Sequence, residues 1–469
     1  MEKPDFSLPF SSSNTTSTTR YWLWLAVATL AISGLGPLIL LAGRASRFAE
    51  KSFIKSSFAE ALVVHVNLSA VAWFLAIALL MWSLFTQPRH PRIYGLREAA
   101  IVSFAMGMLC VAGAPLMGNG TALFSNYIPM YTSPLFLVGL GLMAIALLCG
   151  ILDIRLSRNG SIALSNAQSA QHFGILGSAF IVLVALAHFG WAYIRLPMPD
   201  ASLSPGAAQN YYEIIFWAGG HILQLAYTQL LLVAWLWLGS AAGLNISINK
   251  RLLLGLFSIY PLIALTSPLG FVGNSAPYNL EFYTQQMRHG GGSAAILLGL
   301  YLAWRLIKSG KPDCEQRLPW ICLVTSMAVF LVGGVIGYMI SGTNTIIPAH
   351  YHGSIVGTTV AFMGVIYLLL PRLGYASPLR SNAAIIQPLL YGGGSVLHAV
   401  GFAIAGGYGA ERKAVGAADS APEAMHSALQ VMRVGGGLAV IGGAMFVVLV
   451  IIAIRRKSKS TDTSHTGSV

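Results

Sequence analysis

The fold of this chain is decided by the stretch IPAHYHG at residues 347–353, which opens an apolar run that continues to residue 371. A run of this length can cross a lipid bilayer, because a spanning helix needs about 20 mostly apolar residues. Positions two apart on a helix differ by about 200°, so His350 and His352 should point to opposite sides. Since neutral imidazole is a common heme ligand, one helix here can offer an axial ligand to a flat macrocycle on either flank.

The composition of the whole chain agrees with a membrane location. Of the 469 residues, 55% are hydrophobic and only 9% are charged. A soluble domain carries roughly 25% charged residues, so this chain cannot cover a water-facing surface and must face lipid. The sequence therefore predicts an all-α integral membrane protein.

Twelve apolar runs are long enough to span a bilayer. They lie near residues 21–43, 59–86, 97–119, 131–154, 171–196, 212–243, 251–273, 290–308, 319–341, 346–371, 386–407 and 434–454. The longest polar interruptions are 44–58, 274–288 and 408–433. The first run is long enough to span rather than to be cleaved as a signal peptide. We expect an N-terminal tail over 1–20, a twelve-helix domain over 21–456 and a disordered tail over 457–469.

The net charge of +13 is better explained by topology than by a nucleic-acid partner. With twelve spans, 19 of the 28 Lys and Arg residues fall in the termini and the even-numbered loops, and the other 9 fall in the odd-numbered loops. Positive charge marks the cytoplasmic side of a membrane protein. Both termini and both tails are therefore expected in the cytoplasm, and no nucleic-acid partner is expected.

Histidines within the spans are the most informative ionisable residues, because such groups are costly in a bilayer and mark functional sites. Four of them should share one layer, roughly 6–14 Å below the outer boundary at a helical rise of 1.5 Å per residue. These four are His65, His221, His350 and His352. A common depth favours a cofactor site over scattered packing histidines, and His65 is then a candidate second axial ligand. His188 and His398 also lie within spans and are interpreted as packing residues.

Five segments, in the right order, resemble subunit I of the heme-copper oxidase superfamily, which includes the catalytic subunits of cytochrome c oxidase and nitric oxide reductase. The stretch 347–374 looks like its tenth helix, and the segment opening at His65 is similar to its second helix. Residues 217–221 resemble its sixth-helix motif, in which a Trp and a Gly precede a histidine. Residues 118–127 and 406–413 look like its loop between helices three and four and the turn before its last helix.

The resemblance implies a twelve-transmembrane-helix bundle of subunit I type with two hemes. His65 and His352 would then bind the low-spin heme, and His350 would bind the high-spin heme. By the same resemblance, His221 is a copper ligand preceded by Trp217, and catalysis would centre on His350 and His221. The adjacent basic residues Arg412 and Lys413 would pair with heme propionates, since charge-assisted hydrogen bonds are strong. We predict b-type hemes, although no motif fixes the heme side chains.

The sequence departs from the family at the copper site. Where the family has a histidine pair at the outer end of helix seven, the best alignment places Val272 and Gly273. Neither can bind a metal, and one remaining imidazole does not hold copper well. Asn274 or His289, at the outer mouth of span eight, are the candidate substitutes. A copper or iron ion beside the high-spin heme is therefore not expected.

Two further departures concern the reaction. The tyrosine found in many oxidases four residues after the sixth-helix histidine is Leu225 here, and Tyr227 lies on another face. The glutamate of nitric oxide reductases is absent from this region, where the nearest polar residue is Gln224. Because the spans contain almost no carboxylates, we expect no proton pumping through a carboxylate relay. A short polar path through residues 227–229 is conceivable, although polar residues on one helix more often serve packing.

Three functions follow as hypotheses. The first is a respiratory oxidoreductase that passes electrons through the low-spin heme to the high-spin heme, which reduces O2, NO or another small oxidised nitrogen or sulfur species. Its donor would be an outer-side cytochrome c or copper protein, or a partner similar to subunit II. The second is a non-catalytic diheme protein for electron transfer or gas binding, suggested by the lost histidine pair. The third, a heme-free transporter, is disfavoured by the scarcity of midplane charges. The expected location is a bacterial cytoplasmic membrane.

Overall fold

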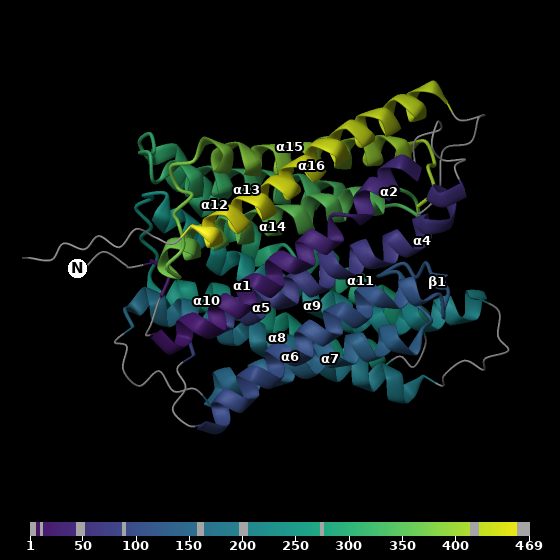
Figure 1. Ribbon diagram of the computed structural model, residues 1–469, viewed down its shortest axis with the longest axis horizontal. Helices are drawn as coiled ribbons and strands as arrows, with labels where there is room; N and C mark the ends of the chain where they lie inside the picture. Colours follow the sequence, from purple (N-terminus) through teal and green to yellow (C-terminus); the bar gives the residue numbers. More distant parts are fainter. Residues whose placement is uncertain are drawn as a thin grey trace, which may run out of the picture.

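The structure, a computed structural model, describes residues 6–9, 13–43, 52–86, 91–156, 164–196, 205–272, 276–412 and 422–456. Within these ranges, twelve helical segments are long and apolar enough to cross a membrane. They run side by side along the longest axis of the molecule (Figure 1). The predicted all-α integral membrane fold with twelve spans is confirmed.

In the described residues, the first five spans are built from nine helical segments, with one small hairpin between the third and fourth spans. In chain order the helices are α1 (Ser13–Ser33), α2 (Gly36–Gly43), α4 (Ser52–Val66), the π-helix η1 (Asn67–Ala72), α5 (Trp73–Ser83), α6 (Pro91–Gly113) with the 3-10 turn η2 (Ala114–Met117), α7 (Pro134–Leu156) and α8 (Asn166–Arg195). Strands β1 (Ala122–Leu123) and β2 (Met130–Tyr131) pair antiparallel between η2 and α7. The first and second spans are therefore each interrupted, at residues 34–35 and by η1.

The last seven spans follow with short connections. They are formed by α9 (Pro205–Ala241), α10 (Lys250–Leu265) with the 3-10 turn η3 (Ser267–Phe271), α11 (Ala276–Gly290) with α12 (Ser293–Lys308), α13 (Arg317–Tyr338), α14 (Ile346–Arg372), α15 (Asn382–Gly407) and α16 (Glu423–Arg455). Consecutive helices pack as neighbours, most extensively α15 with α16, α13 with α14, α6 with α7 and α8 with α9.

Helices α9 and α14 form the centre of the bundle. Of their most apolar 18-residue windows, 94% and 83% are buried, against 22% for α16, whose outer face is left for lipid. Figure 1 shows α6 with α7 at one edge of the bundle and α15 with α16 at the other. The helix that carries IPAHYHG is therefore a central element, covered by protein on most of its surface.

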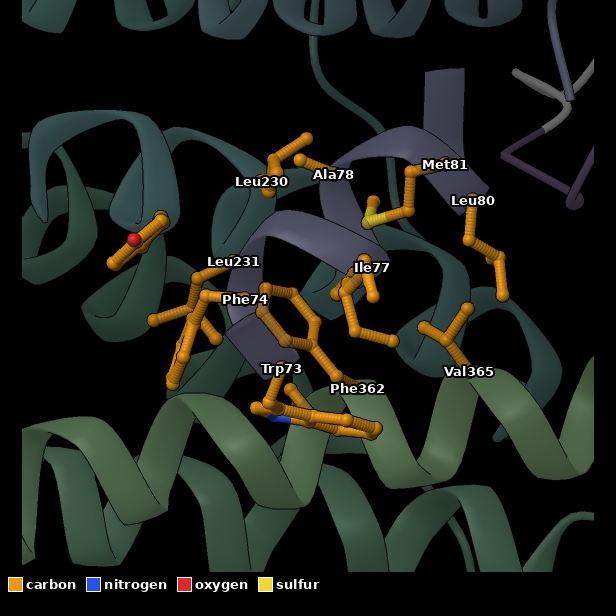
Figure 2. Close-up of a cluster of buried hydrophobic side chains, with 14 of the residues drawn as sticks. Trp73, Phe74, Ile77, Ala78, Leu80, Met81, Leu230, Leu231, Phe362 and Val365 are labelled. Atoms are coloured by element: carbon orange, nitrogen blue, oxygen red, sulfur yellow. The ribbon is translucent and has the colours of Figure 1, made fainter. Parts of the chain in front are cut away.

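The hydrophobic core joins α5 to both central helices, as Figure 2 shows. Phe74 of α5 contacts Phe362 of α14 edge to face, with ring centroids 5.7 Å apart. The same ring lies 4.6 Å from the ring of Tyr227 on α9. Trp73, the residue before Phe74, is fully buried. Apolar packing thus fixes the second span against α9 and α14. This packing also sets where His65 of the second span lies relative to His350 and His352 of α14.

The polar stretch 274–288 is largely helical rather than an extended interruption, since α11 covers most of it. Helix α11 is amphipathic, with Asn279 and Tyr283 buried and Glu281 and His289 exposed. The Tyr283 hydroxyl donates to the Ser267 carbonyl at 2.7 Å and holds η3 against α11. The span predicted from the apolar run near 290–308 is therefore too short, because the helical span extends from Tyr278 to Lys308.

The N-terminal segment also has structure beyond the first predicted span. Helix α1 begins at Ser13, before the apolar run at residue 21. Upstream, Phe6 and Leu8 are buried, and the Leu8 carbonyl accepts a hydrogen bond from Arg372 at the end of α14. Residues 6–9 thus pack on the end of the bundle opposite the paired histidines. The C-terminal tail over 457–469 lies outside the described residues.

Candidate heme site

A large apolar cavity lies beside α14, on the flank that His352 faces. Its volume is about 1070 Å³, and its walls come from α1, α2, α4, α7, α8, α9, α14, α15 and α16. His65, His352, His398 and Arg412 line it among mostly aliphatic side chains. Cofactor cavities typically measure about 300–1,000 Å³ and carry a few placed polar groups on an apolar wall. This cavity is large enough for a macrocycle and brings together two of the predicted heme ligands.

His65 stands at the junction of α4 and η1, where the local backbone fixes its ring. Its Nδ1 lies 3.1 Å from both the carbonyl and the hydroxyl of Ser33 on α1. The His65 carbonyl accepts a hydrogen bond at 2.7 Å from the Ser69 hydroxyl, inside the π-helical turn. A Cβ on Gly36 would lie 2.8 Å from the His65 Cβ, so glycine is needed there for α2 to approach. With Nδ1 occupied, Nε2 is the nitrogen presented for iron.

His350 and His352 of α14 face different neighbours, as their spacing predicts. The His350 Nδ1 lies 2.7 Å from the Gly333 carbonyl of α13, and a Cβ on Gly337 would meet that ring. The His352 Nδ1 lies 2.7 Å from the Pro348 carbonyl of its own helix, and its ring contacts α15. Each Nδ1 engages a carbonyl, the arrangement that orients histidine for metal binding through Nε2.

His221 of α9 is enclosed by two aromatic rings. Its ring centroid lies 4.9 Å from Trp217 and 5.1 Å from Tyr127, and its Nδ1 lies 2.6 Å from the Trp217 carbonyl. The Trp217 Nε1 donates to the Leu280 carbonyl of α11 at 3.0 Å. A Cβ on Gly220 would overlap the Tyr127 ring, which explains the glycine before the histidine.

Tyr127 is a site residue whose place beside His221 the sequence did not reveal. It comes from the loop between α6 and α7, which the resemblance identified only as a segment. Burial, with Tyr227 nearby, raises the pKa of Tyr127 well above its ordinary value of 10.0. The phenol therefore stays protonated at neutral pH and can donate a hydrogen bond beside His221. Only the three-dimensional packing against Gly220 brings it there.

Arg412 is held at the cavity by a small polar network. Its two Nη atoms donate to the side-chain and backbone oxygens of Asn126 at 3.1 and 2.9 Å. Asn126 in turn donates from Nδ2 to Glu213 of α9 at 2.9 Å. The Arg412 Nε is buried without a protein partner, as expected if an anionic group completes its surroundings. Lys413, its predicted companion, lies outside the described residues.

These residues fit a heme. The cavity supplies apolar walls, His65 and His352 supply imidazoles from two helices, and Arg412 supplies a buried donor with an unmet N–H. His398 also lines the cavity, where its ring lies 4.6 Å from His352. Interpreting His398 as an ordinary packing histidine missed this position. No periodicity signals it, because His398 is on a different helix.

The described residues do not fit a copper site. Val272 is exposed at the end of η3, and residues 273 and 274 lie outside the described part of the chain. His289 is exposed at the end of α11, with its Nε2 3.0 Å from the Gln285 side chain. In the ranges that the structure covers, no three His, Cys, Asp or Glu residues gather in a metal-binding group. Among the described residues, His221 therefore belongs to no group of three such side chains.

The residues near the tyrosine and glutamate positions of the family are partly in the cavity wall. Gln224 and Tyr227 line the cavity, and Leu225 is buried in the core. Gln229 donates from Nε2 to the carbonyls of Gly174 and Phe257, at 3.2 and 2.9 Å, and so ties α9 to α8 and α10. Its described bonds are those of a packing residue.

Two similar sequences and one solved structure extend the comparison. An uncharacterized protein of Rickettsia prowazekii (strain Madrid E) is 29% identical over 94% of this chain and 96% of its own length. An uncharacterized protein of Aquifex aeolicus (strain VF5) is 28% identical over 76% of this chain and 86% of its own length. A heme-copper terminal oxidase solved by cryo-EM shares the fold, with a TM-score of 0.68 and 14% identity, over 96% of this chain and 86% of that one.

The family itself is shown by a sequence profile rather than by these pairwise likenesses. The profile described as "Cytochrome C and Quinol oxidase polypeptide I" matches residues 17–439, which include every described histidine discussed above. The match runs from the first turn of α1 to about the middle of α16, so it tests nearly the whole bundle and not one motif. The chain therefore belongs to the cytochrome c and quinol oxidase polypeptide I family, that is, subunit I of the heme-copper oxidases.

Proposed function

We propose that this chain is the heme-bearing subunit of a membrane oxidoreductase that reduces O2 or NO with electrons from the outer side. Family membership supports an oxidase-like, heme-dependent oxidoreductase in a multi-pass membrane protein. In the proposal, His65 and His352 hold a low-spin heme and His350 holds a high-spin heme, both b-type. When bound, the hemes supply one-electron transfer and an iron that takes up a diatomic gas.

The observation that carries the proposal is the pair of imidazoles on one cavity. His65 comes from α4 and His352 from α14, almost 290 positions apart in sequence, yet both line the same space. His350 lies two residues from His352 and turns to α13 instead. The two proposed ligands on α14 are therefore separated by a single residue. The two hemes would lie close together, and the path for electrons between them would be short.

The protein groups around the proposed hemes have distinct tasks. The Ser33, Gly333 and Pro348 carbonyls orient the three ligand imidazoles through Nδ1. Arg412 offers its Nε to an anionic edge group, and Lys413 is proposed as its companion. Trp217 and Tyr127 enclose His221, which is proposed as a polar group beside the high-spin heme rather than as part of a metal trio. His289 is not given a metal role.

The donor and the location extend the proposal. We propose an outer-side donor, a cytochrome c, a copper protein or a subunit II-like partner, and a bacterial cytoplasmic membrane with both termini inside. The excess of Lys and Arg in the termini and even-numbered loops supports this orientation. Residues 21–456 would form the diheme domain, flanked by cytoplasmic tails over 1–20 and 457–469.

Spectroscopy of the purified, full-length protein tests the heme assignment. We expect two hemes per chain, one six-coordinate and one that binds CO. His352→Ala and His65→Ala should each remove the six-coordinate signal, and His350→Ala should remove CO binding while keeping that signal. The exposed His289→Ala variant is the matched control and should change neither. Retention of the six-coordinate signal in both His352→Ala and His65→Ala would show that the assignment is wrong.

A second candidate is a diheme protein without turnover, for electron transfer or gas binding. It is favoured by Val272 at the position of the histidine pair and by the absence of a metal-binding group in the described residues. Steady-state consumption of O2 or NO with a reduced donor separates the two candidates. Intact hemes with no consumption of either gas would support the second.

A further inference from the structure

We propose that His398 is a positioning residue that fixes the plane of the His352 imidazole at the low-spin heme. The inference rests on the proposed function, since it takes His352 as a ligand of that heme. His398 has no family role assigned above and was expected only to pack. Its position on the shared cavity and its contact with His352 give it a specific task.

The first observation is the contact that limits rotation of the His352 ring. The ring centroids of His352 and His398 lie 4.6 Å apart, with planes inclined by 56°. Phe402, one turn further along α15, lies 5.9 Å from the His352 ring and 4.7 Å from the His398 ring. The two α15 side chains thus form a wall on one side of His352. Rotation of the His352 ring toward α15 would drive it into this wall.

The second observation is that the wall itself is anchored. The His398 Nδ1 lies 2.8 Å from the Met432 carbonyl of α16. Its ring also fits against α16 only because that helix has glycine there. A Cβ on Gly436 would lie 2.8 Å from the His398 Nδ1, and one on Gly435 would overlap the His398 backbone nitrogen. Gly436 and the Met432 carbonyl therefore hold the His398 side chain, while Gly435 lets the backbones of α15 and α16 approach each other.

In this proposal, the hydrogen bond of His352 to its own helix does not by itself fix the plane of the imidazole. The Pro348 carbonyl accepts from the His352 Nδ1 within the same turn of α14 and fixes that edge of the ring. The His398 and Phe402 rings of α15 limit the same ring from another element. Outer partners of a metal-bound histidine set its orientation, and orientation is one of the ways in which a protein tunes a heme. The relative planes of two axial imidazoles affect the d-orbital splitting of ferric iron, which EPR reports directly.

Substitution of His398 in the full-length, heme-loaded protein tests the inference, with EPR g values of the oxidised low-spin heme as the readout. His398→Leu removes both the ring and its bond to Met432. We expect the heme to stay six-coordinate while its largest g value shifts and its midpoint potential changes. If the leucine variant does not fold, His398→Gln is the second variant, because it keeps a side-chain donor but lacks the ring. The same kind of shift is expected.

His188→Leu is the matched control. His188 is another buried histidine within a span, and its Nδ1 also lies 2.7 Å from a carbonyl of its own helix, that of Val184. It contacts Phe271 and Tyr283 instead of the cavity wall. Its substitution should leave the low-spin g values unchanged. A shift in this control equal to that in His398→Leu would overturn the inference as a general effect of losing a buried histidine.

The remaining outcomes separate this inference from the proposed function. Parental g values in both His398 variants, together with loss of the six-coordinate signal in His352→Ala, would refute the positioning role and leave the heme assignment standing. A five-coordinate heme in His398→Leu, together with a six-coordinate signal in His352→Ala, would make His398 rather than His352 the ligand and would also refute positioning. A six-coordinate signal that survives both His352→Ala and His65→Ala would refute the proposed function first.

Discussion

Arg412 and Glu213 place opposite charges on one polar network beside the cavity, and this makes a test at the level of single residues. Asn126 bonds to both side chains. A positive charge near a heme stabilises its reduced form, so Arg412→Gln should lower the low-spin midpoint potential and Glu213→Gln should raise it. Charge interactions of about 1–2 kcal/mol at an effective dielectric near 20 correspond to about 40–90 mV for one electron.

A potentiometric titration of the purified variants measures both shifts. Glu281→Gln, an exposed glutamate on α11, is the control, because screening by solvent and salt should leave the potential unchanged. Shifts of the same sign in the Arg412 and Glu213 variants would contradict a charge effect. They would indicate that loss of the Asn126 bonds dominates.

At this scale the histidines of α14 and α4 can be singled out from the sequence as candidate ligands, because their signal lies in depth and helical spacing. The cavity shared by His65 and His352 agrees with that expectation. His398 and Tyr127 were missed as site residues for one physical reason. Each reaches the site through a close approach, at Gly436 and Gly220, that depends on how separate segments pack. A single sequence records the glycine but not the neighbour that occupies its space.

Helices α15 and α16 depend on glycine for their contact, which gives a prediction at the level of elements. A Cβ on Gly435 would overlap the His398 backbone nitrogen and crowd the Gly394 carbonyl, whereas Gly437 has nothing within 4 Å. Gly435→Ala should therefore destabilise the protein by about 1–3 kcal/mol, the usual cost of overpacking. Gly437→Ala, two residues away on the same helix, is the control and should cause no loss of stability, because alanine is the better helix former.

Thermal unfolding of the detergent-solubilised variants, followed side by side, measures the difference. Equal midpoints for the two alanine variants would mean that α16 can move away from α15 at little cost. The close helix packing described here would then not be required for stability. Small residues at helix contacts are the common solution in lipid, where apolar burial gives little preference for one partner over another.

The ends of the helices were predicted where hydropathy alone sets them. They were missed where polar residues also form part of a helix. Helix α14 was expected at 346–371 and spans Ile346–Arg372. Helix α11 lies in a stretch that composition marks as a polar interruption, because only one of its faces is buried. The π-helix η1 after His65 also left no signal in hydropathy. There, the Ser69 and Asn67 side chains donate to the His65 and Val63 carbonyls, contacts that a hydropathy profile does not record.

At the scale of the whole molecule, composition and twelve apolar runs were sufficient for the architecture. The low charge content excludes a water-exposed surface, and the run lengths set the number of spans, so the fold follows from the bilayer as solvent. The order of the motifs then identified the family. The arrangement of helices around the cavity does not follow in this way. It depends on which face of each helix packs inward, as for the nearly fully buried α9.

The orientation of the bundle decides which face receives electrons, and the protein's own cysteines allow it to be tested. Cys314 is exposed in the connection between α12 and α13, while Cys110, Cys149 and Cys322 lie in spans. The distribution of Lys and Arg predicts a cytoplasmic location for this connection. A membrane-impermeant maleimide should therefore label Cys314 in inside-out vesicles and not in right-side-out vesicles. Ser341→Cys in a Cys314→Ser background puts a thiol in the exposed connection at the other end of α13, and its labelling should be reversed. Labelling of Cys314 from the outside would show that the bundle has the opposite orientation in the membrane. Arg412 and the histidine layer would then face the cytoplasm, and an outer-side donor would be ruled out.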